Sequence, residues 1–296
     1  MSKTEEKQSA VCWVCDHTNL KVVKKSDLDA TIDSSNFAIT NSDYGKTGEL
    51  SKCENCGFIQ CTDGTDVIHF YEDLVDEEYE NTRAQRKLQE QRIMKLIQAV
   101  KPSGKHLDIG AGSGIMVEAA IEMGYDSIGV EPSKWLQKTA TEKGLPIKLG
   151  IFPMEGLDDK FDVITLVDVI EHVNNPKQLM QDIQKALAPD GLLVVITPDV
   201  DSFLAKRLKW KWWHFRIAHI GYFNSKTMDL VAKASNLKTI KFLRPAWYFN
   251  LGYLIKRGYQ YLPKFLRIPV PGFISKRVVR VNLRDSLLYM YKTDKP

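Results

Sequence analysis

Short continuous apolar runs alternate with segments of helical period along residues 105–292. The run Phe161–Val167 is apolar at almost every position after its Asp, which is typical of a parallel strand covered on both faces. Residues 82–100 instead gather their apolar side chains on one helical face. We expect strands at residues 105–109, 145–149, 161–167, 192–197, 237–243 and 282–292 and one ending at residue 131, with helices at 82–100, 176–187 and 225–235. The alternation predicts an α/β fold.

A glycine-rich turn joins the first expected strand to the helix that follows it. Gly110, Gly112 and Gly114 have no Cβ atoms where a ligand must touch the backbone, and the helix start offers unpaired N–H groups. Glu131 ends the next strand, close to the spacing at which β-α-β units bind the two hydroxyls of a ribose. The unit therefore predicts a site for an adenosine-type cofactor.

A carboxylate at the end of the first strand narrows the choice of cofactor. Asp108 precedes the first glycine of the turn, where it would repel the pyrophosphate of a dinucleotide. The same carboxylate suits a positively charged group. S-adenosylmethionine carries an ammonium and a sulfonium and has no phosphate, so the residues favour it over a dinucleotide.

Four segments resemble, in order, the motifs of class I S-adenosylmethionine-dependent methyltransferases: LDIGAGSG, GVEPS, FDVITLVDVIEHV and LAPDGLLVVITP. The similarity covers roughly residues 103 to 243. It implies a Rossmann-like, doubly wound and mostly parallel seven-stranded sheet, and methyl transfer from S-adenosylmethionine; an inert scaffold of that fold is the alternative. The expected cofactor-binding residues are Asp108, Gly110, Ala111, Gly112, Gly114, Glu131, Pro132, Phe152, Asp168 and Val169.

The end of the fourth strand is expected to face the methyl acceptor. Asp168-x-x-Glu171-His172 is similar to the E-x-x-E-H of ubiquinone-biosynthesis O-methyltransferases, which implies a divalent cation near these three residues. The Asp in place of the first Glu shortens the reach toward such a cation. His172 is the first candidate for a base that takes a hydroxyl proton, His219 the second and His214 the third. The alternative is that Glu171 and His172 only orient the following loop.

Two cysteine pairs predict a metal site near the N-terminus. Cys12-x-x-Cys15 and Cys53-x-x-Cys56 offer four soft ligands, which favour tetrahedral Zn²⁺ in a closed site with a structural role. Residues 10–62 therefore predict a zinc ribbon, a module that is found in a bacterial group of similar methyltransferases. Free thiols or disulfides are the alternative.

The charge of the chain is divided unevenly. Residues 1–201 carry 21 Lys and Arg against 34 Asp and Glu, whereas residues 202–296 carry 20 against 3, a balance of +17. Residues 244–281 mix these cations with Trp, Tyr, Phe and Leu and are interrupted by prolines. Such amphipathic segments bind anionic membrane surfaces. RNA is less favoured as the partner, and a homodimer interface is the alternative.

The sequence thus predicts a zinc-ribbon-like module at residues 1–62, a lid and helix at 63–102, and a methyltransferase domain at 103–296 with an insertion at about 244–281. Tyr71 and Tyr79 are the candidates for cofactor contact from the lid. The expected acceptor is a small molecule or a lipid- or saccharide-linked group, with O-methylation favoured. An RNA-binding methyltransferase and a non-catalytic membrane-docked scaffold are the alternatives. With no signal peptide or apolar span, we expect a cytoplasmic protein, peripheral at the inner membrane surface.

Overall fold

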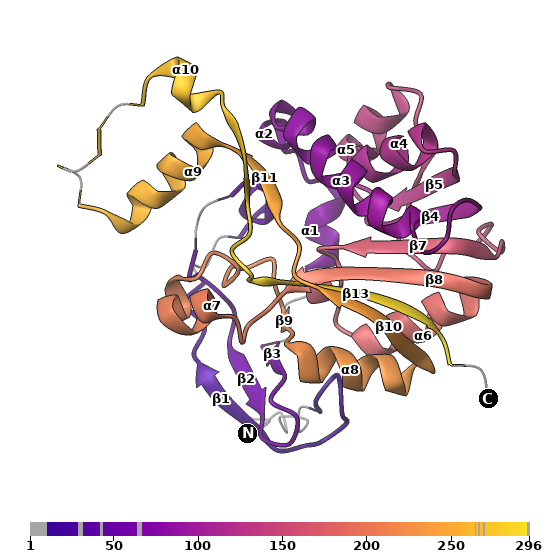
Figure 1. The fold of residues 1–296 in the computed structure, drawn as a ribbon. Helices are drawn as coiled ribbons and strands as arrows, with labels where there is room; N and C mark the ends of the chain where they lie inside the picture. The colour runs from indigo at the N-terminus through magenta and orange to yellow at the C-terminus, as the bar shows by residue number, and fades with distance from the viewer. Residues whose placement is uncertain are drawn as a thin grey trace.

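The computed structural model describes residues 11–28, 32–41, 44–63, 67–263, 265, 267–268 and 270–294. Its centre is a seven-stranded sheet in the order β10-β13-β8-β7-β4-β5-β6, in which β13 runs antiparallel to its neighbours β8 and β10 (Figure 1). The strands are β4 (Lys105–Ile109), β5 (Asp126–Glu131), β6 (Ile147–Leu149), β7 (Phe161–Val167), β8 (Leu187–Pro198), β10 (Leu237–Leu243) and β13 (Ser286–Thr293). The expected α/β class and sheet are confirmed.

Helices cover both faces of this sheet, which explains why its strands are apolar at consecutive positions. On β7, Val163 packs with residues of α3 and α4, whereas Ile164 and Leu166 pack with residues of α6 and α8 on the opposite face. The helices are α3 (Arg83–Gln98), α4 (Ile115–Glu122), α5 (Lys134–Thr141), α6 (Pro176–Ala186) and α8 (Ser225–Ala234). The expected helices are present to within one or two residues at their ends.

Three strand starts differ from the sequence expectation, the first being that of β6, which begins at Ile147 and not at residue 145. β8 begins at Leu187, not at 192, because Leu187 already pairs with Phe161 before the register jumps to the Val163–Leu192 pair. The residues around Pro189 thus form an irregularity within the strand. β13 begins at Ser286 instead of residue 282, after the insertion has returned to the sheet.

The N-terminal ribbon is built into the same molecule by a shared sheet. Its strands β1 (Leu20–Lys24), β2 (Leu50–Cys53) and β3 (Ile59–Cys61) pair antiparallel, and β3 also pairs with β9 (Gly221–Tyr222), which belongs to the segment after β8 (Figure 1). Phe58 is fully buried, and its ring centroid lies 4.8 Å from that of Phe223. The ribbon and the central sheet therefore share one hydrophobic core.

The remaining elements gather around the carboxyl ends of the central strands. The lid comprises η1 (Ser34–Phe37), α1 (Ile68–Glu72) and α2 (Glu77–Asn81), and the segment after β8 forms α7 (Phe203–Leu208) and η3 (Lys209–Lys211). The insertion is a hairpin of β11 (Trp247–Asn250) and β12 (Val278–Val281) that carries α9 (Leu251–Gly258), η4 (Tyr259–Tyr261) and α10 (Gly272–Ser275). Among the described residues, no helix is long and apolar enough to cross a membrane.

Replacing Phe58 with Ala should lower the free energy of unfolding by about 3–5 kcal/mol, because it leaves a cavity where the ribbon meets the central core. Urea denaturation followed by tryptophan fluorescence measures this change. Phe203→Ala is the matched control: that ring is 79% exposed, and its loss should cost less than about 0.5 kcal/mol. Equal losses in the two variants would contradict a shared core.

Candidate functional site

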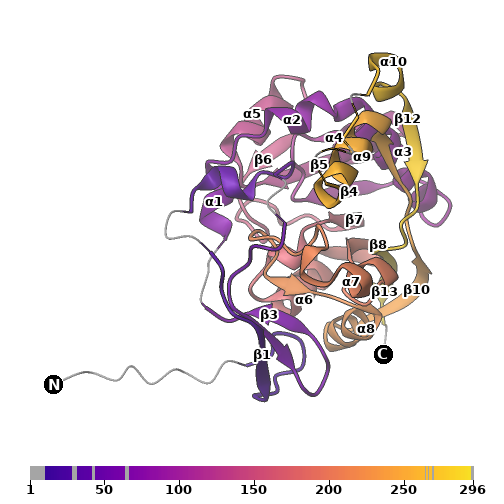
Figure 2. The same cartoon turned by 90° about the vertical axis from the view of Figure 1, so that its left-hand side faces the viewer.

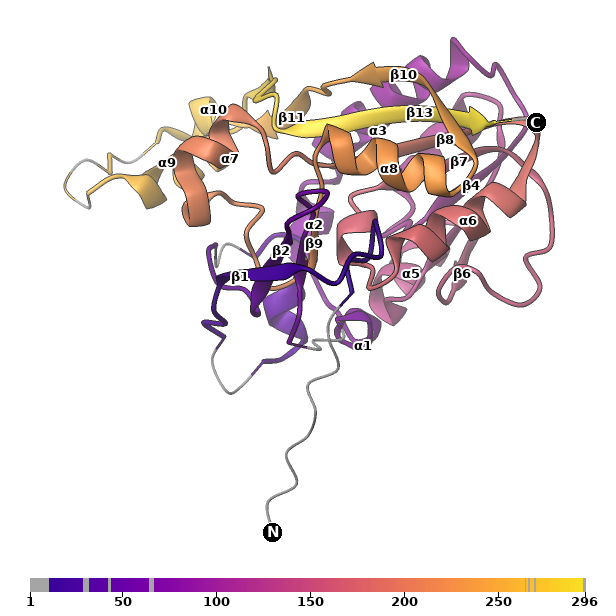
Figure 3. The ribbon, with the colours of Figure 1, turned by 90° about the horizontal axis from the view of Figure 1, so that it is seen from below.

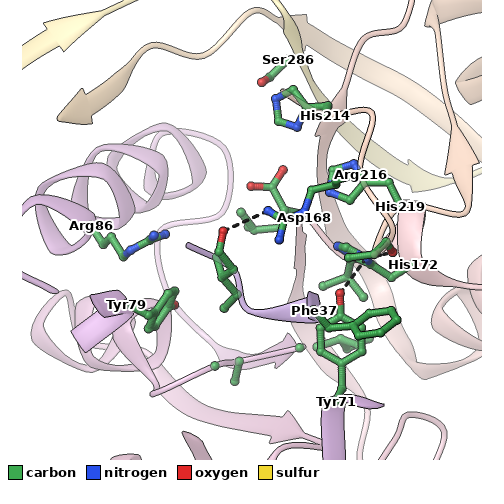
Figure 4. A pocket seen from close by; sticks show the side chains of 18 of the residues that line it. Phe37, Tyr71, Tyr79, Arg86, Asp168, His172, His214, Arg216, His219 and Ser286 are labelled. Carbon is green, nitrogen blue, oxygen red and sulfur yellow. Dashed lines mark hydrogen bonds between the residues drawn. The ribbon is translucent and has the colours of Figure 1, made fainter. Parts of the chain in front are cut away.

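A cavity of about 900 Å³ lies at the carboxyl ends of β4, β5 and β7. In a parallel sheet, the loops that follow the strands converge at this edge and line the crevice. Asp108, Glu131 and Asp168 line the cavity from the ends of those three strands, and the opposite wall comes from the lid, α7 and α9. Figure 4 shows Asp168 together with Tyr71 and Tyr79 of the lid among the residues that line it. The other expected residues that line it are Gly110, Ala111, Gly112, Pro132, Phe152, Val169, His172 and His219, as well as Tyr71, Tyr79 and His214.

The glycine turn brings bare backbone to the cavity wall. Gly110 and Gly112 have φ angles of 72° and 55°, a region that glycine adopts readily. A Cβ on Gly112 would lie 2.9 Å from the Tyr79 hydroxyl, and one on Gly110 would lie 2.5 Å from a methyl of Val169. Gly114 differs from the expectation: it does not line the cavity, since it caps α4 and its Cβ would meet Leu145 in the packed interior at 2.8 Å.

The Glu131 carboxylate is held by two backbone donors. The Gly112 N–H donates to Oε2 and the Ser133 N–H donates to Oε1, both at 2.8 Å. Burial raises the pKa of Glu131 to about 7, although these two donors favour the charged form. Each carboxylate oxygen retains a second lone pair, so Glu131 can accept hydrogen bonds from two ligand hydroxyls.

A buried hydrogen-bond chain orients Asp108. Thr165 Oγ1 donates to Asp108 Oδ1 at 2.6 Å, His106 Nε2 lies 2.9 Å from Thr165 Oγ1, and Ser127 Oγ lies 2.7 Å from His106 Nδ1. Because the Thr165 hydroxyl donates its proton to Asp108, it must accept a hydrogen bond from His106 Nε2–H. His106 Nδ1 then carries the lone pair and accepts from the Ser127 hydroxyl. Sequence reasoning missed these three positioning residues; their only signal was polar side chains inside apolar strands.

Further carboxylates make the cavity strongly acidic. Glu90 of α3 lines it, and burial together with the charges of Asp108 and Asp168 raises its pKa to about 8. Burial also raises the pKa values of Asp108 and Asp168 to about 7, while the Arg86 cation opposes this for Asp168 and Glu90. A ligand with positive charge would relieve this repulsion. Glu90 was not anticipated because it lies outside the matching motifs.

His172 presents one defined nitrogen for chemistry. Its Nδ1 lies 2.6 Å from the Ala218 carbonyl oxygen and 2.9 Å from the Tyr71 hydroxyl (Figure 4). A carbonyl can only accept, so Nδ1 carries the proton and Nε2 carries the lone pair. Burial lowers the pKa of His172 to about 4, which keeps the ring neutral at pH 7. The His219 ring centroid lies 4.8 Å away and that of His214 follows at 5.5 Å from His219.

Beside these rings lies a carboxylate that is not fully paired. Glu171 is 1% exposed; its Oε2 accepts from the Thr197 hydroxyl at 2.9 Å, and its Oε1 has no hydrogen-bond partner in the described part of the chain. Ligand atoms of Glu171, His172 and His219 lie within 4.8 Å of one another. Two imidazoles and a carboxylate suit a divalent cation. Asp168, expected in this group, is not part of it, and His219 takes its place.

The four ribbon thiols form a separate cluster away from the cavity. The Sγ atoms of Cys12 and Cys56 lie 3.6 Å apart, as do those of Cys15 and Cys53, and all four lie within 4.8 Å. A tetrahedral site with Zn–S bonds of about 2.3 Å has sulfur–sulfur edges of about 3.8 Å. The cluster therefore has the dimensions of a closed four-thiolate zinc site.

The aromatic residues that follow β8 divide between core and cavity. Trp212 is fully buried and Trp210 is 37% exposed, whereas Trp213 lines the cavity. Further aromatic walls come from the insertion, and Arg216 and Arg257 add positive charge on this side. The aromatic side chains of the insertion that line the cavity are Trp247, Phe249, Tyr253 and Tyr261. This end of the cavity is thus lined by aromatic rings and arginines, with Asp285 among them, whereas the end at the glycine turn is lined by carboxylates.

Comparison with known proteins agrees with this geometry. A family model described as a methyltransferase domain matches residues 79–241, more than half of the chain. Ubiquinone biosynthesis O-methyltransferase from Actinobacillus pleuropneumoniae serotype 7 (strain AP76) is 35% identical over 105 residues, 31% of this chain and 45% of that protein. The uncharacterized protein MJ1123 of Methanocaldococcus jannaschii is 34% identical over 116 residues, 37% of this chain and 54% of that protein. The chain thus spans about half of the length of these relatives.

A solved structure shares the fold. A Listeria monocytogenes protein, provisionally named as an S-adenosylmethionine-dependent methyltransferase, superposes with a TM-score of 0.51 at 13% identity and covers 72% of this chain and 100% of its own. At that identity the likeness concerns the fold alone. The family match over residues 79–241, with the acidic cavity at the glycine turn, shows that the chain belongs to the methyltransferase-domain family, among the class I S-adenosylmethionine-dependent methyltransferases.

Proposed function

We propose that this protein transfers the methyl group of S-adenosylmethionine to a hydroxyl of a small-molecule or lipid- or saccharide-linked acceptor. The observation that carries this proposal is a single cavity with an acidic end at the glycine turn and a histidine pair with an aromatic wall at the other. The named activity of the O-methyltransferase relatives supports oxygen as the methylated atom. Nothing in the cavity or the relatives favours RNA as the acceptor or an inert scaffold.

The acidic end suits each part of the cofactor. Glu131 accepts from the ribose hydroxyls, and Asp108, Glu90 and Asp168 balance the ammonium and sulfonium charges. Phe152, 8% exposed, lines the cavity in the loop after β6, where it flanks the adenine. A pyrophosphate in the same place would meet four carboxylates and is disfavoured.

The transfer is an in-line displacement at the sulfonium methyl. The acceptor oxygen forms a bond to the methyl carbon, the carbon–sulfur bond breaks, and sulfur leaves as a neutral thioether. The hydroxyl proton passes to His172 Nε2, whose lone pair is set by the Nδ1 contact with Ala218. Most of the acceleration comes from alignment of the two reactants within the cavity.

The cluster of Glu171, His172 and His219 also fits a divalent cation. The orphaned Glu171 oxygen and the neutral imidazoles would hold it, and the Thr197 hydroxyl and the Ala218 carbonyl would orient the ligands from behind. A bound cation would occupy the Nε2 lone pair of His172, so this residue would then be a ligand and not the base, and the cation would instead lower the pKa of the acceptor hydroxyl. His219 would then complete the site from the segment that joins β9.

The ribbon is proposed to hold structural zinc, which positions the acceptor wall. β3 pairs with β9 through Ile59–Tyr222 and Gln60–Gly221, and the Ile220 N–H donates to the Glu171 carbonyl at 2.9 Å. His219 directly precedes this pairing. Zinc bound to the ribbon thiolates would therefore fix the position of His219 without contact with the reactants.

Replacing Glu131 with Ala should weaken S-adenosylmethionine binding by at least about 10-fold, because charged hydrogen bonds to the ribose hydroxyls are lost. Isothermal titration calorimetry measures the dissociation constant. Glu122→Ala, an exposed ion-pair position on α4, is the control and should bind the cofactor as the unchanged protein does. Unweakened binding in Glu131→Ala would exclude the ribose contact.

Replacing His172 with Ala should lower the rate of methyl transfer by about 10²–10⁴-fold while the cofactor dissociation constant stays unchanged, since a base is lost without a cofactor contact. Tritiated methyl transfer into lipid and metabolite extracts measures the rate. His17→Ala, at an exposed ribbon position, should be fully active. A variant at His172 with normal turnover would remove this residue from the mechanism.

Replacing Cys53 with Ser should remove one equivalent of zinc per chain and destabilise the ribbon, because a closed site needs all four thiolates. Metal content by plasma mass spectrometry and thermal unfolding measure the two effects. Cys61→Ser is the matched control, since Cys61 lies outside the cluster. Zinc retained in Cys53→Ser, or absent from the unchanged protein, would contradict the site.

A further inference from the structure

Large apolar side chains project into solvent at one end of the molecule. Phe203 of α7, Phe265 and Phe273 are 79%, 84% and 79% exposed, and Ile268 is 72% exposed. We call α7, η3 and the described part of residues 251–280 the docking face. Large apolar side chains that are exposed together at one end of a molecule are typical of a surface that binds a partner or a membrane.

The docking face is also uniformly basic. The sequence ranges 203–211 and 251–280 together hold eleven Lys and Arg and no Asp or Glu. The described exposed cations of these segments are Lys206, Arg207, Lys209, Lys211, Lys256, Arg267, Lys276, Arg277 and Arg280. Alternating cations and exposed rings match the chemistry of an anionic lipid headgroup layer above hydrocarbon.

Contacts hold the parts of this face together. The Tyr261 hydroxyl donates to the Lys211 carbonyl at 2.8 Å and so ties η4 to η3. Arg257 of α9 donates to the Thr40 carbonyl at 2.6 Å, and its guanidinium lies over the Tyr44 ring. Figures 1 and 3 both place α7, α9 and α10 at the same end of the molecule, and Figure 2 looks onto that end. The face is therefore a connected surface.

The inner side of the same elements forms part of the methyl-acceptor cavity. Leu204 and Leu208 of α7 and Leu254 of α9 line the cavity, together with Tyr261. Phe203 and Phe273, on the same segments, point to solvent and are not part of the cavity wall. An acceptor that enters between α7 and α9 would thus pass directly from the surface bound by the docking face into the cavity.

We propose that the docking face binds an anionic lipid bilayer, with Phe203, Phe265 and Phe273 inserted among the lipids, and that the acceptor carries a lipid anchor. The identity of the acceptor rests on the proposed function; the docking itself does not. A second copy is disfavoured as the occupant, because a two-fold interface would bring this cationic face against itself. RNA is disfavoured because Ile268, Leu262 and Val278, which cannot stack on bases, are exposed among the rings.

Vesicle flotation of the full zinc-loaded chain tests the proposal. The protein should float with vesicles of phosphatidylglycerol and phosphatidylcholine at low salt and stay at the bottom with phosphatidylcholine alone, and high salt should reduce floating on the anionic vesicles. The triple variant Phe203→Ser, Phe265→Ser, Phe273→Ser should lower the partition coefficient by on the order of 100-fold. Its affinity for S-adenosylmethionine, measured by calorimetry, should not change.

Val75→Ser and Ile121→Ser are the matched controls, since these side chains are 53% and 43% exposed in the lid and on α4, outside the docking face. The controls should float as the unchanged protein does. Failure of the unchanged protein to float, or equal floating of the triple variant, would overturn the proposal. Two further results would also overturn it, if the unchanged protein does not bind vesicles. One is a dimer in sedimentation that the triple variant no longer forms; the other is binding of an RNA oligonucleotide that the triple variant has lost. Cofactor binding without flotation would refute docking and leave the proposed methyl transfer intact.

Discussion

Parallel pairing of β4 with β5 and β7 is the constraint on which the site depends. The ladders Ile109–Val130 and Ile109–Leu166 align the three strand ends, so Asp108, Glu131 and Asp168 emerge at one edge of the sheet. None of these side chains is a neighbour of another in sequence. The buried apolar layers on both faces maintain this alignment, which makes the packed core a direct cause of the acidic cavity.

The buried carboxylates of the cavity are electrostatically unfavourable in their charged forms. Glu90 and Glu131 have raised pKa values because solvent is excluded from their carboxylates, and neighbouring carboxylates raise that of Glu90 further. A cationic, phosphate-free ligand relieves this cost on binding. The cavity therefore favours such a ligand through its buried carboxylates as well as through the shape of the glycine turn.

The ribbon and the insertion complete the cavity on its acceptor side. The ribbon acts through β9, which ties the segment of His219 to Glu171. The insertion acts through α9, on which Tyr253 and Arg257 line the cavity and Lys256 is exposed on the outer side. Two modules that lie outside the central sheet thus both contribute to the wall of one cavity.

The sequence by itself determined the sheet, the glycine turn, the strand-end carboxylates and the paired cysteines, because periodicity and short spacing encode local structure. It did not reveal Glu90, the His106–Thr165 support of Asp108 or the replacement of Asp168 by His219 beside Glu171. It also assigned Gly114 to the cofactor, although that residue packs against Leu145. These features depend on contacts between segments distant in the chain, and only the tertiary packing of the ribbon, the lid and β9 against the sheet decides which side chains meet.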